Sequence, residues 1–367
     1  MKIIAVIGTR PTFIELAPII NELRKTDCEL VICNTGQHYD REMASIFLDQ
    51  LHIDNVEHNL EVGSGSHAMQ TARILTRFER VLESEMPDLV LVEGDTTSAF
   101  AAALAAVKLK IKVAHVEAGC RNYDRKLPEE VNRVLISHMA DEHFPPTLNC
   151  KLNLIKEGIP EDSIRAVGHP IVDSIMSVSS LIDSANKLTE LGLQKKTFVY
   201  FTLHRDFNVD DSSRLESILK EMGMLAESMQ VIFALHPRTR ARIRKFGLLK
   251  LLAPFNTLRP VDYITSLSLT KNSFCVVSDS GGLTKESAIL GTPCVTLRPD
   301  TEWTETTQGL GNQLAFAPGN TISKCFGRIQ KDYRRAVVDS SKSRLLFGKP
   351  GISRKITKEL IDLVAPL

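Results

Sequence analysis

Residues 90–97 read Val-Leu-Val-Glu-Gly-Asp-Thr-Thr, and residues 113–119 read Val-Ala-His-Val-Glu-Ala-Gly. Each run begins like a buried parallel strand and then reaches a carboxylate, Asp95 in the first and Glu117 in the second. The alanine-rich residues 97–109 between them predict a helix. In open α/β sheets, ligands bind beyond the carboxyl ends of the strands. We therefore expect a parallel sheet that brings these two carboxylates to one site.

The same alternation of strand and helix continues along the chain. In the first half it predicts strands at residues 3–8, 30–35, 89–93, 113–117 and 143–145. It predicts helices at residues 18–25, 42–51, 68–85, 97–109 and 130–139. A second series follows, with strands at residues 198–202, 231–235, 274–278 and 294–297. Two such series predict an α/β fold of two doubly wound, Rossmann-like domains that face a cleft, with a boundary near Gly168.

The composition limits the kinds of partner that the chain can bind. Its 367 residues include 45 basic and 44 acidic side chains, a balance that argues against nucleic acid or a membrane surface as partner. No apolar run approaches the roughly 20 residues of a membrane span, and residues 1–8 lack a signal-peptide cleavage site. Seven cysteines without a Cys-x-x-Cys pair suggest reduced thiols. We therefore expect a cytoplasmic protein.

The turn after the first predicted strand reads Gly8-Thr9-Arg10-Pro11. Pro11 suits the first position of a helix, and Arg10 carries a fork of donors that fits phosphate. A competing interpretation is an ordinary strand-to-helix turn with a solvated arginine. The motif by itself leaves both interpretations open.

The turn between the strand at 274–278 and a helix at 283–290 reads Ser278-Asp279-Ser280-Gly281-Gly282. The paired glycines permit a close backbone approach, and the free amides at the helix start can bind an anion. Glu286, one turn later, could accept hydrogen bonds from ribose hydroxyls. A competing interpretation is a plain helix cap by Asp279 or Ser280 with Glu286 in solvent. The turn is neither a dinucleotide fingerprint nor a Walker loop, so we expect no such cofactor.

Further ionisable residues lie at strand ends and helix starts. His204 follows the strand at 198–202, where it could donate to a leaving phosphate or act as an acid or base. Glu129 lies in the first turn of a helix, and Arg133 one turn later could form a stabilising pair with it. Purely structural roles are also possible, with Asp95 as a helix cap and Glu129 favoured by the helix dipole. The histidines show no ligand spacing for a metal, so we expect none.

Taken together, these motifs closely resemble those of the non-hydrolysing UDP-N-acetylglucosamine 2-epimerases. The matching segments are residues 8–11, 35–38, 94–97, 115–119, 128–133, 204–205 and 279–286. The resemblance implies a fold like that of the glycosyltransferase-B class and a homodimer. It implies that residues 1–168 contact the sugar and supply the acid–base groups, and that residues 169–352 bind UDP. It also implies that the final helix, residues 353–367, returns to the first domain.

The resemblance implies roles for individual residues. The acid–base carboxylates are Asp95, Glu117 and Glu129. Arg133 and His204 support the departing UDP or the charge network of the site. The nucleotide ligands are Arg10, Ser280, Gly281, Gly282 and Glu286.

The implied reaction is the reversible epimerisation of UDP-N-acetylglucosamine to UDP-N-acetylmannosamine, without a cofactor, by elimination and re-addition of UDP. Two departures from the family pattern bear on the sugar. Glu15 replaces a usual lysine, and Trp303 stands in a motif that usually reads Thr-Glu-Arg-Pro-Glu. Such a tryptophan resembles relatives that epimerise UDP-2,3-diacetamido-2,3-dideoxyglucuronate. The sequence is also compatible with a glycosyltransferase, a UDP-sugar-binding protein without catalysis, or a hydrolysing epimerase.

Overall fold

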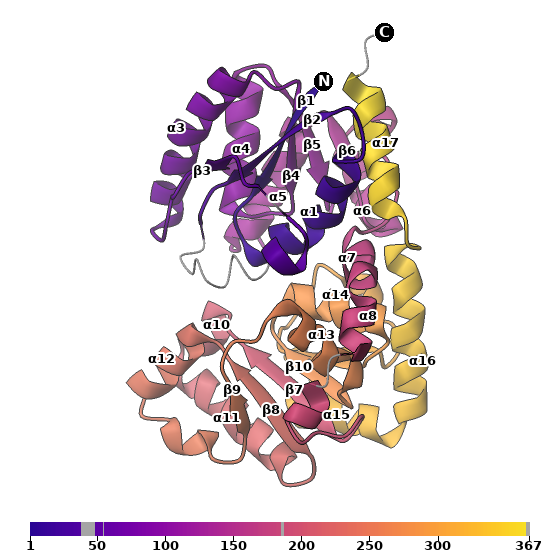
Figure 1. Cartoon of the computed structure of the whole chain (residues 1–367). Helices are drawn as coiled ribbons and strands as arrows, with labels where there is room; N and C mark the ends of the chain where they lie inside the picture. The colour runs from indigo at the N-terminus through magenta and orange to yellow at the C-terminus, as the bar shows by residue number, and fades with distance from the viewer. Residues whose placement is uncertain (38–47, 54, 185–186, 365–367) are drawn as a thin grey trace. The chain divides into compact units, whose positions relative to one another are not determined.

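The computed structural model describes residues 1–37, 48–53, 55–184 and 187–364 (Figure 1). The chain forms two compact units, Met1–Val178 with Phe347–Leu367, and Ser179–Leu346. The boundary was expected near Gly168, but the first unit continues to Val178. It includes α7 (Ile171–Ser177), which packs on α1 (Arg10–Leu23). His38 of the family motif lies outside the described residues, and so do residues 42–47 of the helix expected at residues 42–51.

The first unit contains a parallel six-stranded sheet in the order β3-β2-β1-β4-β5-β6. Its strands are β1 (Lys2–Ile7), β2 (Glu29–Asn34), β3 (His58–Asn59), β4 (Leu89–Glu93), β5 (Lys112–Val116) and β6 (Glu142–Phe144). The other described helices of this unit are α3 (His67–Glu85), α4 (Thr97–Lys108), α5 (Pro128–Met139), α6 (Leu148–Lys156) and α17 (Ile352–Val364). The five strands expected in this unit are confirmed to within a residue at each end. The short edge strand β3 was not predicted.

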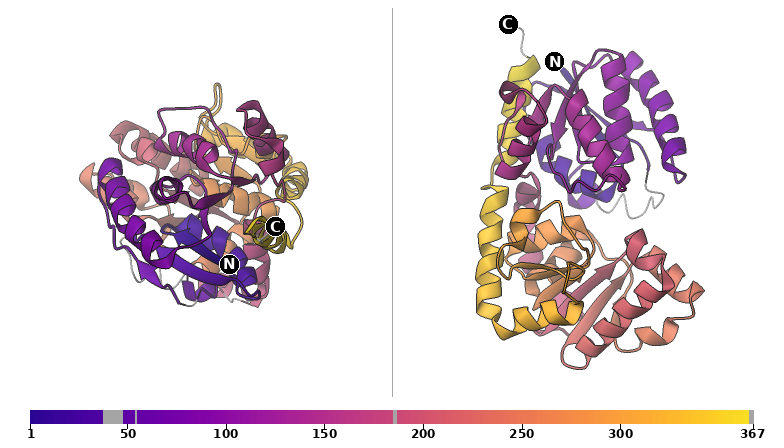
Figure 2. Two further views of the ribbon diagram at one scale, coloured as in Figure 1. Left: turned by 90° about the horizontal axis from the view of Figure 1, so that it is seen from above. Right: turned by 180° about the vertical axis from the view of Figure 1, so that it is seen from behind.

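Helices cover both faces of this sheet (Figures 1 and 2). Alternate residues of β1 point to opposite faces, as in any strand. Ile4 and Val6 join a core with Phe78 of α3 and Ala102 of α4. On the other face α1 packs against β1, and α17 packs against α1. Burial of both faces explains why the strands read as continuous apolar runs.

The second unit repeats this architecture with a parallel sheet in the order β12-β11-β10-β7-β8-β9. Its strands are β7 (Phe198–Leu203), β8 (Gln230–Leu235), β9 (Asn256–Leu258), β10 (Cys275–Ser278), β11 (Cys294–Thr296) and β12 (Asn312–Leu314). Its described helices are α8 (Ser179–Ser184), α9 (Lys187–Glu190), α10 (Asp206–Val209), α11 (Ser212–Ala226), α12 (Pro237–Lys245), α13 (Tyr263–Asn272), α14 (Gly281–Leu290), α15 (Ile322–Lys331) and α16 (Tyr333–Arg344). Short 3₁₀ turns lie at Leu249–Leu252 and Thr304–Thr307 in this unit, at Glu161–Ser163 in the first unit, and at Leu345–Phe347 where the chain returns to the first unit. The two Rossmann-like sheets confirm the predicted α/β fold class.

Helix α1 begins earlier than the strand–helix alternation predicted. The alternation placed its start at Pro18, whereas the Gly8-Thr9-Arg10-Pro11 turn placed a first helical position at Pro11. The helix begins at Arg10 and contains Pro18 in its interior, which confirms the second of these predictions. Thr9 provides an extended N-cap, and Pro11 occupies the first turn, where the lack of an N–H costs nothing. The earlier start places Arg10 and Glu15 on the same helix.

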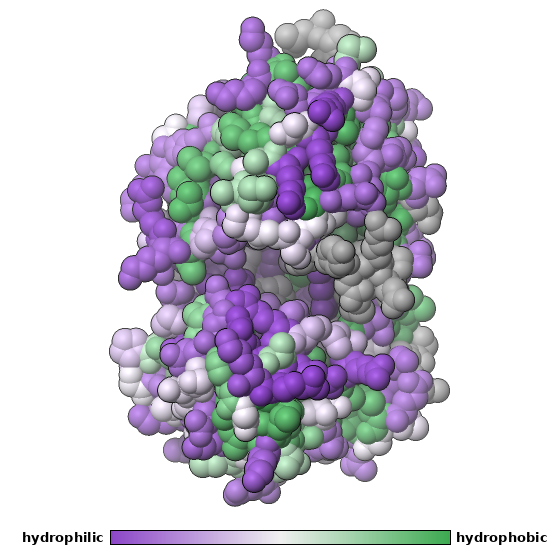
Figure 3. Space-filling model, turned by 90° about the vertical axis from the view of Figure 1, so that its left-hand side faces the viewer, coloured by the Kyte–Doolittle hydropathy of each residue, from purple (hydrophilic) through white to green (hydrophobic). Residues whose placement is uncertain are grey.

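The surface mixes polar and apolar residues. On the face shown in Figure 3, hydrophilic and hydrophobic residues are interspersed over each unit. Among the described residues, no helix combines the length and the apolar character needed to cross a bilayer.

Candidate active site

Asp95 and Glu117 lie beyond the ends of two neighbouring strands of the first unit. Strands β4 and β5 are paired in parallel, with Glu93 opposite Val116. The N–H of Gly94 donates to the carbonyl of Val116 at 3.0 Å, which joins the two turns. Glu117 has a φ of +63°, a left-handed conformation that is uncommon for a residue with a side chain and recurs at functional sites. The structure thus brings together the two carboxylates that the sequence placed at one sheet edge.

Helix α5 supplies the basic partner of Asp95. Arg133 forms an ion pair with Asp95 and a second with Glu130 at 3.1 Å. The amide nitrogen of Asn132 donates to the carbonyl of Asp95 at 2.9 Å. The sequence paired Arg133 with Glu129, one turn away. In the structure Arg133 forms ion pairs with Glu130 and with Asp95, whose turn lies next to this helix. The expected pair with Glu129 stays a prediction.

The three acid–base candidates also interact through their charges. Burial raises the pKa of Asp95, the charge of Arg133 opposes this rise, and the charges of Glu117 and Glu129 add to it. Glu129 lies in the first turn of α5 and is partly exposed. Carboxylates that raise the pKa of Asp95 favour its protonated form, as a group that exchanges protons requires.

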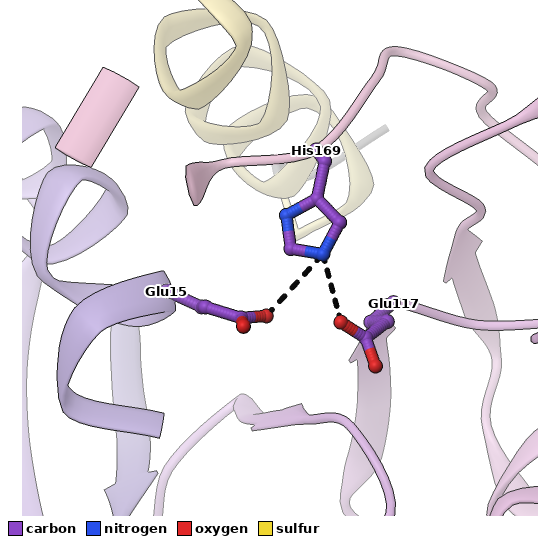
Figure 4. Close-up of side chains that lie close together, drawn as sticks. All are labelled: Glu15, Glu117 and His169. Carbon is purple, nitrogen blue, oxygen red and sulfur yellow. Dashed lines mark hydrogen bonds and ion pairs between the residues drawn. The ribbon is translucent and has the colours of Figure 1, made fainter. Parts of the chain in front are cut away.

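Glu117 has a second set of neighbours, which the sequence did not predict. Nε2 of His169 lies 2.7 Å from Oε2 of Glu117 and 3.4 Å from Oε2 of Glu15 (Figure 4). His169 is fully buried, and Glu15 has 1% of its surface exposed. Glu15 comes from α1 and His169 from the loop before α7, so three distant segments meet at one histidine.

Arg10 lies at the first position of α1, where it is partly exposed. The turn before it is tightly packed, because a Cβ on Gly8 would lie 2.0 Å from Oγ1 of Thr35. The tight turn fixes where the guanidinium leaves the backbone. Whether Arg10 binds phosphate stays a prediction.

His204 belongs to the second unit and is held by Asp279. Its Nδ1 lies 3.0 Å from Oδ1 of Asp279, and the backbone N–H groups of His204 and Arg205 also donate to this carboxylate. The amide of Asn208 donates to it at 3.1 Å. Burial would raise the pKa of Asp279, but the charge of His204 and these hydrogen bonds outweigh burial and lower it to about 2. Asp279 is therefore an ionised anchor that orients His204.

Ser280, Gly281 and Gly282 form the start of α14 in the second unit. The Ser280 side chain accepts the N–H of Leu283 at 3.3 Å, so it is the N-cap that one interpretation of the sequence gave. The same interpretation placed Glu286 in solvent, and that part is wrong, because only 3% of Glu286 is exposed. A cap and an anion site are compatible, since the glycine amides still point from the helix start.

The departure at Trp303 is buried beside this helix. Nζ of Lys285 lies 4.7 Å from the centre of the Trp303 ring, a cation–π contact. Glu302 forms an ion pair with Arg298 at 2.8 Å. A Cβ on Gly281 would lie 2.7 Å from Oε1 of Glu302, so this carboxylate lies directly against the start of α14.

Comparisons with known proteins identify the family. A family model described as UDP-N-acetylglucosamine 2-epimerase matches residues 21–361. A protein of Methanococcus maripaludis, described as a UDP-N-acetylglucosamine 2-epimerase homolog, is 45% identical over 99% of this chain and 100% of its own length. The chain belongs to the UDP-N-acetylglucosamine 2-epimerase family. Its predicted membership of this isomerase family is confirmed.

Two further relatives within this family bear on the substrate. A crystal structure of the Methanocaldococcus jannaschii UDP-GlcNAc 2-epimerase in complex with UDP-GlcNAc and UDP has a TM-score of 0.88 and 37% identity, and the match covers 99% of this chain and 100% of that one. The UDP-2,3-diacetamido-2,3-dideoxy-D-glucuronate 2-epimerase of Pseudomonas aeruginosa is 38% identical over 88% of this chain and 90% of its own length. The roles of individual residues in this chain remain predictions.

Two residues beside the candidate site were missed by the sequence analysis. His169 adjoins the domain boundary expected near Gly168 and was given no role there, and Lys285 was not considered. The signal for His169 was weak, since its contacts with Glu15 and Glu117 join segments far apart in the chain. Lys285 directly precedes Glu286, so its place on the first turns of α14 could have drawn attention to it.

Proposed function

We propose that this chain interconverts UDP-N-acetylglucosamine and UDP-N-acetylmannosamine by inverting carbon 2 of the sugar. Membership of the family supports the reaction. The observation that carries the proposal is the pair of carboxylates, Asp95 and Glu117, beyond neighbouring strands, with Glu129 close enough for its charge to act on Asp95.

The chemistry explains why several acids are needed. The hydrogen at carbon 2 is not acidic in the resting sugar. When the anomeric C–O bond to UDP breaks first, positive charge develops at carbon 1, and a carboxylate can then remove the neighbouring proton. This elimination gives 2-acetamidoglucal and UDP. Return of the proton to the opposite face of carbon 2, with re-addition of UDP to carbon 1, completes the inversion, so acid–base groups must act on both faces.

The second unit supplies donors suited to a diphosphate. Amides of Gly281 and Gly282 at the start of α14 and the dipole of that helix favour negative charge. His204, oriented by Asp279, can donate a hydrogen bond to the departing phosphate. We assign Glu286 to the ribose and Arg10 of the first unit to the phosphates.

Proton NMR in heavy water tests the reaction. Purified protein given UDP-N-acetylglucosamine should form the manno epimer with deuterium at carbon 2, because the removed proton exchanges with solvent. An epimer without deuterium would exclude proton abstraction at carbon 2. Absence of the epimer, with sugar transfer when an acceptor is added, would instead indicate a glycosyltransferase.

A second candidate substrate is UDP-2,3-diacetamido-2,3-dideoxyglucuronate. Trp303 favours it, because the Pseudomonas aeruginosa relative acts on that sugar by its name and the sequence motif resembles such relatives. Lys285 also places a positive charge against the ring of Trp303, where an acidic sugar could gain from it. The same NMR assay with both substrates distinguishes them by their kcat/KM values.

We also infer a cytoplasmic homodimer, which the resemblance to the family supports. Light scattering of the purified chain should give twice the monomer mass. A monomer that is fully active would contradict the dimer as the working form.

A further inference from the structure

His169 has a defined protonation state, set by its backbone contact. The N–H of Ile171 donates to Nδ1 of His169 at 3.2 Å. Because Nδ1 accepts this hydrogen bond, the ring proton is assigned to Nε2 and the imidazole is neutral. Nε2–H then donates to Glu117 at 2.7 Å and faces Glu15 at 3.4 Å.

The ring of His169 is fixed by contacts within the first unit. Its backbone N–H donates to the carbonyl of Phe347 at 2.9 Å, and the rings of the two residues meet edge to face with centres 5.9 Å apart. Gly168 has a φ of +108°, and a Cβ there would lie 2.7 Å from the same carbonyl. A histidine held in this way can hold a carboxylate in one orientation.

The Nε2–H group of His169 therefore lies between two carboxylates and donates its hydrogen bond to one of them, Glu117. The facing atoms of Glu15, Glu117 and His169 all lie within 4.8 Å of one another, in a buried place. A carboxylate this close to Glu117 makes Glu117 hold a proton more tightly, because two like charges in such a site repel. A lysine at position 15 would have the opposite effect.

We propose that His169 and Glu15 are positioning residues for Glu117: His169 orients its carboxylate through Nε2–H, and the charge of Glu15 makes it a stronger base. The inference rests on the proposed function, in which Glu117 exchanges a proton at carbon 2. The same three residues could reach a metal ion, but a metal would need the Nε2 lone pair, and the hydrogen bond from Ile171 assigns a proton to that atom.

The variants His169→Ala, His169→Gln and Glu15→Gln test the inference. Matched controls are His143→Ala and His143→Gln, since His143 is 1% exposed in the same unit and bonds through Nε2 to the carbonyl of Ser137 at 2.7 Å. Measurements are kcat, KM, deuterium incorporation at carbon 2 and the unfolding temperature. Removing a partner that orients an active group lowers activity on the order of 10-fold to 100-fold.

We expect His169→Ala to lower kcat by such a factor with KM unchanged, and His169→Gln to recover part of the loss through its amide N–H. We expect Glu15→Gln to lower kcat less and to move the acid limb of the kcat profile to lower pH, because Glu117 then binds its proton less tightly. The His143 variants should lower the unfolding temperature comparably and leave kcat within about twofold of the unaltered chain.

The outcomes separate the two proposals. If the unaltered chain forms no epimer, the proposed function fails, whatever the variants do. If it forms the epimer and the His169 and Glu15 variants keep full kcat, this inference alone is wrong. A loss of kcat that tracks the unfolding temperature equally at His169 and His143 would make the role structural. A loss of activity in a chelator that zinc restores would make the three residues metal ligands.

Discussion

Asp95 and Asp279 follow strands in equivalent positions of the two sheets, yet their surroundings act in opposite directions. Burial and nearby carboxylates raise the pKa of Asp95 despite Arg133. Around Asp279, His204 and several N–H donors overcome burial and lower the pKa to about 2. The same side chain thus holds its proton more tightly in the first unit and stays ionised in the second. Neighbours, not residue type or position, decide between these states.

The largest effect expected from this contrast is on catalysis at Asp95. Asp95→Asn should lower kcat by about 10²–10⁴, because the amide cannot exchange a proton. The unfolding free energy should change by less than about 1 kcal/mol, since the fold does not favour the ionised acid that the amide replaces. Initial rates and urea unfolding measure the two quantities. A variant as active as the unaltered chain would remove Asp95 from the acid–base set.

Asp279→Asn should show the reverse balance, with a loss of stability. The amide leaves N–H donors of His204 and Arg205 poorly paired in a buried place, which costs about 2–3 kcal/mol of unfolding free energy. Asp210→Asn is the matched control, because burial is slight there although the ion pairs with Arg238 and Arg242 also lower its pKa to about 2. Exposed pairs contribute less than about 1 kcal/mol. Equal losses at both positions would contradict the role of burial.

The two acids should also give opposite pH dependences of stability. The pKa of Asp279 is lowered, so its contribution of about 2 kcal/mol is present above the unfolded value near 3.9 and is lost as pH falls through about 2. The pKa of Asp95 is raised, so its contribution is present at low pH and is lost as pH rises through the folded value. Urea unfolding should show the gap between the unaltered chain and Asp279→Asn closing on acidification. Asp95→Asn should become more stable relative to the unaltered chain as pH rises. Curves of unfolding free energy against pH that run parallel for the unaltered chain and both variants would contradict both directions.

The last comparison concerns the packing of glycines in three turns, and the effects expected there on catalysis are the smallest. A Cβ on Gly119, two residues after Glu117, would lie 2.2 Å from the carbonyl oxygen of Cys150. This clash should lower the unfolding free energy of Gly119→Ala by about 1–3 kcal/mol, in addition to the strain of an alanine at the left-handed φ of +81°. Gly158→Ala is the control, with a φ of +87° and open space, and should cost about 1–2 kcal/mol. Gly281→Ala should cost least in stability, because its φ is not left-handed and the added Cβ would lie closest to the end of the Glu302 side chain rather than to backbone, yet it should raise KM for the UDP-sugar. Thermal unfolding ranks the three, and a different order would contradict this account of the turns.

Local pattern predicted most of the sheet strands because both faces of each sheet are buried, which leaves unmistakable apolar runs. It missed the edge strands β3, β9 and β12, which have two or three residues each and only one fully buried residue among them, Asn312. The hydrophobic alternation also began α1 at Pro18, whereas the Thr9 cap and Pro11, which the turn motif had indicated, begin the helix earlier. These errors share a cause: pairing and capping depend on the backbone as well as on hydrophobicity.

The sequence by itself determined that Asp95, Glu117 and the Ser280 turn stand at strand ends, because periodicity and turn residues fix local structure. It also determined the family, through motifs matched in order along the chain. Only the tertiary structure decided that Arg133 pairs with Asp95 and that His169 joins Glu117 to Glu15. Such contacts link distant segments, and the proton affinity of a carboxyl group depends on which charges and donors the fold places beside it.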